Sequence, residues 1–355
     1  MPPDPLPPGK PGALIWAQRD STLSFDPPQV LWKFLYHSRD QNNHDVAVSG
    51  FAIVPVATAP KGGRAVYAWA HGTTGLGDQC APSKSLKDSI PPYAGSLVGG
   101  NALVVATDYE GLGTPGDHTY LAGVPEGQAM LDSIRAAAAL PNAGPVGDVV
   151  LAGHSQGGGA ALFAAQLAPS YAPELPVRGV VAGAPAAELS AIATAVRTSP
   201  FKASLLLAAS GLRAAYPEFD VSSFLTPSAI ADLPRVANEC VDATNRRYQN
   251  APITDILTAD PAHVPAVAAI LDANSAGAVD PKIPIMIVQG ANDEQIPVSV
   301  SADLAAKYCH LGANATRVVY PGATHDGVID AAQDDVVRWI NDRFKHKTAK
   351  DGCAT

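Results

Sequence analysis

Residues 148–163 read DVVLAGHSQGGGAALF, which is an apolar run, a turn and a stretch of small residues. The turn, Gly153-His154-Ser155-Gln156-Gly157, matches G-x-S-x-G, in which a serine stands on a sharp turn between a strand and a helix. Side chains two residues before or after the serine would collide in so tight a turn, so glycines are needed there. The alternative, an ordinary strand-to-helix turn, does not require this combination. Ser155 is therefore the predicted nucleophile.

A serine hydroxyl is a poor nucleophile at neutral pH, so a base must take its proton and an acid must orient that base. With a serine on this kind of turn, the chain order is serine, acid, histidine. The apolar run Ile283–Val288 leads into Gln289-Gly290-Ala291-Asn292-Asp293-Glu294. A carboxylate just past a strand lies at the same sheet edge as the serine. Asp293 is the predicted acid, and Glu294 is its nearest rival.

The predicted base is His325, which lies between a last short strand pattern and a C-terminal helix pattern. The chain has nine histidines, so the others must be considered. His310 and His346 lie on predicted helices, and His263 lies in a helical insertion. The remaining five come before Ser155, in the wrong chain order.

The oxygen of a tetrahedral intermediate needs fixed hydrogen-bond donors. One predicted donor is the backbone N–H of Gln156, the residue after the nucleophile. The second is expected from the loop His71-Gly72-Thr73-Thr74-Gly75, which follows a strand pattern and whose glycines allow close backbone approach. We assign Thr73, with Thr74 a close second; a plain β turn is the alternative.

The chain alternates apolar strand and helix patterns, which is typical of a mostly parallel sheet covered by helices. The first two β segments, Val30–Ser38 and Val46–Val56, are expected to form an antiparallel hairpin. Asp108 follows a later strand, and a hydrogen-bonding role that locks its loop is favoured over a role in a pocket. Further strands are expected at 65–70, 102–107, 148–153, 179–182, 283–288 and 317–320, and helices at 126–140, after Ser155, and at 327–344.

The β pattern stops between residues 185 and 281, where Ala- and Leu-rich helical stretches replace it. We therefore predict an α/β protein with the α/β-hydrolase fold and an inserted helical cap. The expected catalytic domain comprises residues 1–184 and 282–355, and the expected cap, or lid, residues 185–281.

Composition excludes several kinds of partner. Charged residues make up only 16% of the chain and the net charge is −9, so no basic surface for nucleic acid is expected. No apolar run approaches 18 residues, so we expect a soluble protein without a membrane-spanning segment. No cysteine and histidine spacing typical of a metal site occurs, and neither a metal nor a cofactor is expected. The sequence leaves the oligomeric state open, with a monomer as the expectation.

The four cysteines, Cys80, Cys240, Cys309 and Cys353, are widely spaced and contain no C-x-x-C motif. An even set of this kind favours two disulfides over four buried thiols of a cytosolic enzyme, with three possible connectivities. In the loop-entropy model each disulfide stabilises the fold by at most about 4 to 5 kcal/mol. A secreted protein is the expectation.

The chain contains the motifs His71–Gly75 with Cys80–Ser83, Asp108–Gly113, Gly153–Gly157 and Gly290–Asp293. Together they resemble the secretory lipase family, the Candida antarctica lipase A-like group of the α/β-hydrolases. The likeness runs from about residue 10 to the C-terminus. It implies an exported lipase or carboxylesterase without a cofactor, a helical cap over the acyl site, and disulfides Cys80–Cys240 and Cys309–Cys353. The His-Gly-Thr-Thr-Gly turn departs from the family and looks like a bacterial variant of the oxyanion loop.

The predicted function is hydrolysis of hydrophobic carboxylic esters, with short or medium acyl groups, through an acyl-enzyme. The apolar cap composition motivates it, because such a cap offers a binding surface for an acyl chain. One alternative is an acyltransferase or peptidase with the same three residues, which has thin sequence support. Another is an inactive fold that serves as a binding module. Such a module typically lacks one of the three residues, and all three are present here in order.

Overall fold

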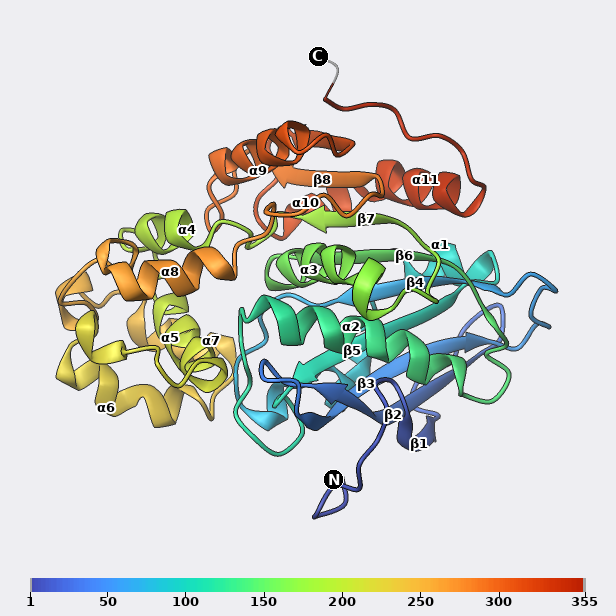
Figure 1. Cartoon of the computed structure of the whole chain (residues 1–355), viewed down its shortest axis with the longest axis horizontal. Coiled ribbons are helices and arrows are strands. Elements are labelled where there is room, and N and C mark those ends of the chain that lie inside the picture. The colour runs from blue at the N-terminus through green and yellow to red at the C-terminus, as the bar shows by residue number, and fades with distance from the viewer. Residues whose placement is uncertain (1, 354–355) are drawn as a thin grey trace.

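A nine-stranded sheet forms the centre of the computed structural model, which describes residues 2–353 (Figure 1). The strand order is β1-β2-β3-β5-β4-β6-β7-β8-β9. The pairs β1–β2, β2–β3 and β3–β5 are antiparallel. The other five pairs, from β5–β4 along the sheet to β8–β9, are parallel. The strands are β1 (Leu14–Asp20), β2 (Gln29–Arg39), β3 (Asp45–Pro55), β4 (Arg64–Ala70), β5 (Leu103–Glu110), β6 (Val146–His154), β7 (Val177–Gly183), β8 (Ile285–Gly290) and β9 (Ala315–Tyr320).

The predicted hairpin of β2 and β3 is confirmed, with Leu35 opposite Ser49 in an antiparallel register. Strand β1 was not predicted. It lies at the edge of the sheet, and four of its seven residues are exposed, Trp16 by 45%. Its residues therefore lack the alternation of apolar and polar side chains that marks a half-buried strand.

Helices cover both faces of the sheet, as strand residues pointing alternately up and down require. On one face Val66 and Ala68 of β4 belong to an apolar cluster with α2 and α3, and on the other Tyr67 and Trp69 belong to a cluster with α1, α10 and α11. The helix α9 also packs on the sheet. The helices around the sheet are α1 (Ala94–Gly99), α2 (Gly123–Ala138), α3 (Gln156–Tyr171), α9 (Val298–His310), α10 (Gly327–Ala331) and α11 (Gln333–Phe344).

The expected helix over 327–344 is two helices that meet at Ala332. Neither a proline nor a glycine marks this break in the sequence. Val328, Ala332 and Val336 are all fully buried against the sheet. The apolar spacing of four residues is therefore kept across the break, and this is why the pattern reads as one helix.

Five α-helices lie between β7 and β8, beside the sheet in Figure 1, and share an apolar cluster of their own. Leu206 of α5 and Leu233 of α6 are fully buried there. The sequence did not predict α6, which contains Pro234, or α7, which is rich in polar residues. The division at residues 185 and 281 into a cap and a catalytic domain stays a prediction. The helices are α4 (Leu189–Val196), α5 (Ser204–Ala215), α6 (Pro227–Val236), α7 (Val241–Tyr248) and α8 (Pro265–Ala273).

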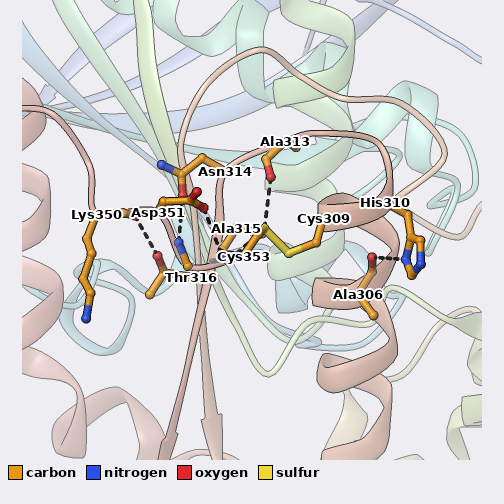
Figure 2. The surroundings of a disulfide bond; sticks show 11 residues. Ala306, Cys309, His310, Ala313, Asn314, Ala315, Thr316, Lys350, Asp351 and Cys353 are labelled. Carbon is orange, nitrogen blue, oxygen red and sulfur yellow. Dashed lines mark hydrogen bonds between the residues drawn. A yellow bond between two sulfur atoms is a disulfide. The ribbon is translucent and has the colours of Figure 1, made fainter. Parts of the chain in front are cut away.

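Both disulfides that the resemblance implies are present, Cys80–Cys240 and Cys309–Cys353. The first joins the loop after β4 to the residue before α7. Figure 2 shows the second, which joins the end of α9 to the C-terminal segment, where Cys353 Sγ lies 3.2 Å from the carbonyl oxygen of Ala313. Within residues 2–353, none of the helices combines the length and the apolar character that a bilayer crossing needs.

Candidate active site

Ser155 stands between the end of β6 and the start of α3, in the strand, turn and helix order that the sequence predicts. Its backbone is strained, with φ 57° and ψ −119°. A Cβ on Gly153 would collide with the carbonyl of Gly157, and a Cβ on Gly157 would collide with the carbonyl of Ala70. Both glycines are therefore required by close backbone approach, and this turn holds the serine at the carboxyl end of the sheet.

Asp293 and His325 follow β8 and β9, two neighbouring parallel strands, and the structure brings their side chains together. His325 Nδ1 lies 2.9 Å from Asp293 Oδ2, and both side chains are buried. The other carboxylate oxygen accepts hydrogen bonds from the backbone N–H groups of Gln295, at 2.9 Å, and Ile296, at 2.8 Å. Hydrogen bonds thus hold both carboxylate oxygens of Asp293 in place.

Burial would raise the pKa of Asp293, but the hydrogen bond and electrostatic attraction from His325, with the two backbone N–H groups, outweigh it and hold this pKa below its ordinary value. An ionised carboxylate accepts only, so Nδ1 of His325 carries the proton. The other ring nitrogen, Nε2, is then free to accept a proton, as a general base must.

Glu294, the rival acid, has a different partner. Its Oε2 accepts a hydrogen bond from the backbone N–H of His325 at 3.2 Å, and its side chain is exposed. The geometry therefore brings Asp293, and not Glu294, to the imidazole ring.

His325 lies beside the turn that carries Ser155. His154 Nε2 is 2.9 Å from the backbone carbonyl oxygen of His325, and the two ring centroids are 4.6 Å apart. Among the side chains that the structure describes, no hydrogen bond joins the Ser155 hydroxyl to His325. Catalytic hydrogen bonds are often long without substrate and tighten when it binds. The acid Asp293 and the base His325 are thus paired in the structure. Proton transfer from Ser155 to His325 stays a prediction.

Thr73 lines the same cavity as Ser155, and its hydroxyl lies 2.8 Å from the Tyr120 hydroxyl. A Cβ on Gly72 would lie 3.7 Å from the Cβ of Ser155, so this loop runs close to the serine. Thr74 instead accepts a hydrogen bond at its carbonyl from Val241 of α7, at 2.9 Å. Of the two threonines, Thr73 is the one that lines the cavity, and its role as an oxyanion donor stays a prediction.

Gln156 is the first residue of α3, where backbone N–H groups have no partner within the helix. Its backbone donor is therefore available next to Ser155, as the prediction of an oxyanion donor requires. Whether Gln156 and Thr73 act as the two donors is part of the proposed mechanism.

A cavity opens at Ser155 and runs between the sheet and the helices of the insertion. About 760 Å³ of space lies within its walls, part of it open to solvent. Its walls are mostly apolar. They include Leu189, Ile192, Ala193 and Val196 of α4 and Leu205 and Ala208 of α5.

Asp108 locks a loop, as the sequence analysis favoured. It is fully buried, its Oδ2 accepts from the Ser49 hydroxyl at 2.6 Å, and its Oδ1 accepts from the backbone N–H of Ser83 at 3.0 Å. Tyr120 and Leu121 also line the cavity, and neither could be recognised as a site residue from the sequence. No motif marks them, because their position depends on how the turn before α2 packs against distant residues such as Gly211 of α5.

One group within residues 2–353 has the composition of a metal site: His154, His325 and Asp326 each place one ligand atom within 4.8 Å of the others. His154 Nε2 already donates to the His325 carbonyl, and His325 Nδ1 donates to Asp293. Burial and electrostatic repulsion from the neighbouring His325 also lower the pKa of His154, to about 4, so this ring is neutral. We assign the group to the hydrogen-bond network of the site.

The fold, the turn that bears Ser155 and the Asp293–His325 pair place the protein in the class of α/β-hydrolases. In this class a serine stands on the sharp turn between a strand and a helix. A family model described as "Secretory lipase" matches residues 94–352. The chain belongs to the secretory lipase family.

Named relatives are consistent with this family. The chain is 31% identical to "Lipase 6" of Candida albicans over 71% of its own length and 57% of the relative. It is 25% identical to "Secreted triacylglycerol lipase LIP4" of Malassezia globosa, over 94% of the chain and 76% of the relative. The structure of Candida antarctica lipase A in its closed state has the same fold, with a TM-score of 0.84 at 23% identity, over 98% of this chain and 85% of that one.

Proposed function

We propose that this protein hydrolyses hydrophobic carboxylic esters through an acyl-enzyme on Ser155. His325 Nε2 takes the proton of the Ser155 hydroxyl as its oxygen attacks the ester carbonyl carbon. Backbone donors at Gln156 and Thr73 hold the oxyanion, and His325 returns the proton to the departing alcohol. Water then attacks the acyl-enzyme by the same route and releases the acid and Ser155.

The observation that carries this proposal is the position of Ser155, on a strained turn at the mouth of an apolar cavity. An apolar wall binds the acyl chain of an ester and offers little to a peptide or a sugar. Membership of the secretory lipase family and the lipase names of the relatives support the same reading. We propose esters of short or medium acyl chains as substrates.

We also propose that the protein acts outside the cell, as a monomer. Its family is described as secretory, one relative is named a secreted lipase, and all four cysteines are paired. Disulfides of this kind persist in oxidising compartments.

A series of p-nitrophenyl esters from acetate to palmitate, with triacylglycerols in parallel, tests the proposed function. Turnover is expected with a maximum at short or medium chains, and a fluorophosphonate probe should label the protein. An enzyme that turned over none of these esters and took up no probe would refute ester hydrolysis.

Filling the cavity is expected to shorten the preferred acyl chain. Ala193 of α4 is buried and lines the cavity, so Ala193→Phe should lower kcat/KM for a decanoate ester by about 10-fold or more and leave the acetate ester within about threefold. Ala191 lies on the same helix but is exposed, so Ala191→Phe is the matched control and should leave both esters unchanged. Equal losses for both esters in Ala193→Phe would show that α4 does not contact the acyl chain.

The two disulfides are expected to differ in their effect on activity. Replacing either cysteine pair by alanines should destabilise the fold, by up to about 5 kcal/mol for Cys80–Cys240 and about 4 kcal/mol for Cys309–Cys353 in the loop-entropy model, because they close loops of 160 and 44 residues. Only the first pair anchors the Thr73 loop, whose Thr74 carbonyl accepts from α7.

We therefore expect kcat to fall about 10-fold without Cys80–Cys240 and to stay within about twofold without Cys309–Cys353. Urea unfolding and p-nitrophenyl butyrate kinetics measure the two effects separately. An equal loss of kcat in both variants would mean that the first disulfide has no special relation to the site.

A further inference from the structure

The Gln156 side chain is held in a buried network. Its Nε2 lies 2.7 Å from Glu126 Oε1 and 3.2 Å from His118 Nε2. His118 Nδ1 is 2.8 Å from the carbonyl oxygen of Glu110, which only accepts, so Nδ1 carries the proton. Burial lowers the pKa of His118 to about 3, so the ring is neutral and its Nε2 accepts. Both hydrogens of the Gln156 amide are therefore hydrogen-bonded, one to Glu126 Oε1 and one to His118 Nε2.

Glu126 joins this amide to a cavity-lining turn. The carboxyl lies on the first turn of α2 and is only 2% exposed, and the same Oε1 accepts the backbone N–H of Leu121 at 3.0 Å. Leu121 has φ 63°, in the left-handed region that residues with a branched side chain rarely adopt. One oxygen of Glu126 thus holds both the first residue of α3 and a strained turn before α2.

The same turn also contacts the loop after β4. Tyr120 precedes Leu121, is buried, and its hydroxyl lies 2.8 Å from that of Thr73. The turn at Tyr120 and Leu121 therefore reaches both parts of the proposed oxyanion hole. It reaches Gln156 through Glu126 and Thr73 through Tyr120.

We propose that Glu126 is a positioning residue for the oxyanion hole, which it holds through the Gln156 amide and the turn at Leu121. This proposal rests on the proposed ester hydrolysis, because the hole acts only when a tetrahedral intermediate forms. Donors must point at the oxygen of that intermediate, so a small displacement weakens transition-state binding more than substrate binding. Loss of the Glu126 side chain therefore lowers kcat and leaves KM nearly unchanged.

The charge of Glu126 gives this role a pH dependence. Burial raises the pKa of Glu126 to about 8, so the carboxyl is neutral at pH 7. The groups that face it are Tyr109 of β5, Tyr120 of the turn, the neutral ring of His118 and the amide of Gln156, and no cation is among these. An ionised Glu126 places a negative charge behind the oxyanion hole. Activity therefore falls as the pH rises through about 8.

The test compares Glu126→Ala and Glu126→Gln with the wild type from pH 6 to 10 on p-nitrophenyl butyrate. In Glu126→Ala, kcat is expected to fall about 10- to 100-fold with KM within about twofold. Glu126→Gln keeps the Oε1 acceptor but cannot ionise, so it should retain kcat at pH 7 within about threefold and lack the loss near pH 8.

Affinity for an alkyl trifluoromethyl ketone provides a second readout. Ser155 Oγ adds to the ketone carbon, its proton passes to His325, and the hemiketal oxygen occupies the oxyanion hole. Glu126→Ala should weaken this inhibitor by the same factor as it lowers kcat/KM, which a merely structural change would not match.

Glu110→Gln is the control. Burial raises the pKa of Glu110 to about 7, and its carboxyl accepts a hydrogen bond from the Thr119 hydroxyl. Only its backbone carbonyl, which the substitution leaves in place, contacts His118. This variant should keep the wild-type kcat and the loss of activity near pH 8.

A folded Glu126→Ala with wild-type kcat and inhibitor affinity would overturn the positioning role, as would a Glu126→Gln that still loses activity near pH 8. If Glu126→Ala does not fold, Glu126→Gln alone decides through its pH profile. Active wild-type protein with unresponsive Glu126 variants would refute only this proposal. Wild-type protein that was inactive and unlabelled by a fluorophosphonate would refute the proposed function as well.

Discussion

Turnover of p-nitrophenyl butyrate is expected to fall by about four to six orders of magnitude in Ser155→Ala. Alanine has no oxygen to form the acyl-enzyme, and the donors that remain at Gln156 and Thr73 give only the residual rate of a site without a nucleophile. Initial rates at saturating substrate and high protein concentration measure this loss.

Ser133→Ala is the matched control for this substitution. Ser133 is a buried serine of α2 whose hydroxyl donates to a backbone carbonyl of its own helix, at 2.7 Å from Met130. It should keep at least half of the wild-type turnover. A Ser155→Ala protein that retained even a tenth of the wild-type rate, after contaminating hydrolases had been excluded, would show that Ser155 is not the nucleophile.

The second large effect is expected at the acid. Asp293→Asn should lower kcat by about three to four orders of magnitude, because an amide does not hold the proton on His325 Nδ1 as the ionised carboxylate does. Glu294→Gln should cost less than about 10-fold, since Glu294 accepts only from the backbone N–H of His325 and glutamine keeps that acceptor. Steady-state kinetics of both variants on one ester give the comparison.

This pair of variants also separates the two acids that the sequence left open. If Glu294→Gln were the more damaging change, the assignment of Asp293 would be wrong. Melting temperatures of both proteins serve as the control for folding, because Asp293 also accepts two backbone hydrogen bonds that shape its loop.

Local sequence was sufficient for the features that depend on neighbours in the chain. The turn at Ser155 follows from the glycines at 153 and 157, and the Asp293 and His325 loops follow from the strands that precede them. Parallel strands end at one edge of a sheet, so the pairing of Asp293 with His325 could be predicted without coordinates. In the structure Asp293 contacts the His325 ring and Thr73 lines the cavity at Ser155, which spacing alone could not predict. The catalytic roles of these residues stay predictions.

Features that depend on distant contacts were not predictable. Strand β1 is recognised only by its pairing with β2, because its exposed side chains carry no alternation. Glu126 reads as an ordinary residue in the first turn of a helix, where acidic side chains are favoured anyway. Its contact with Gln156, 30 residues further on, exists only because α2 packs against α3.

The reaction of the native protein with a fluorophosphonate, mapped by peptide mass spectrometry, tests most directly whether His325 activates Ser155. A single adduct on the peptide that contains Ser155 is expected in the wild type. Its rate of formation should fall by about 1,000-fold or more in His325→Ala. An adduct on another residue, or labelling of Ser155 at the same rate without the imidazole, would contradict the account.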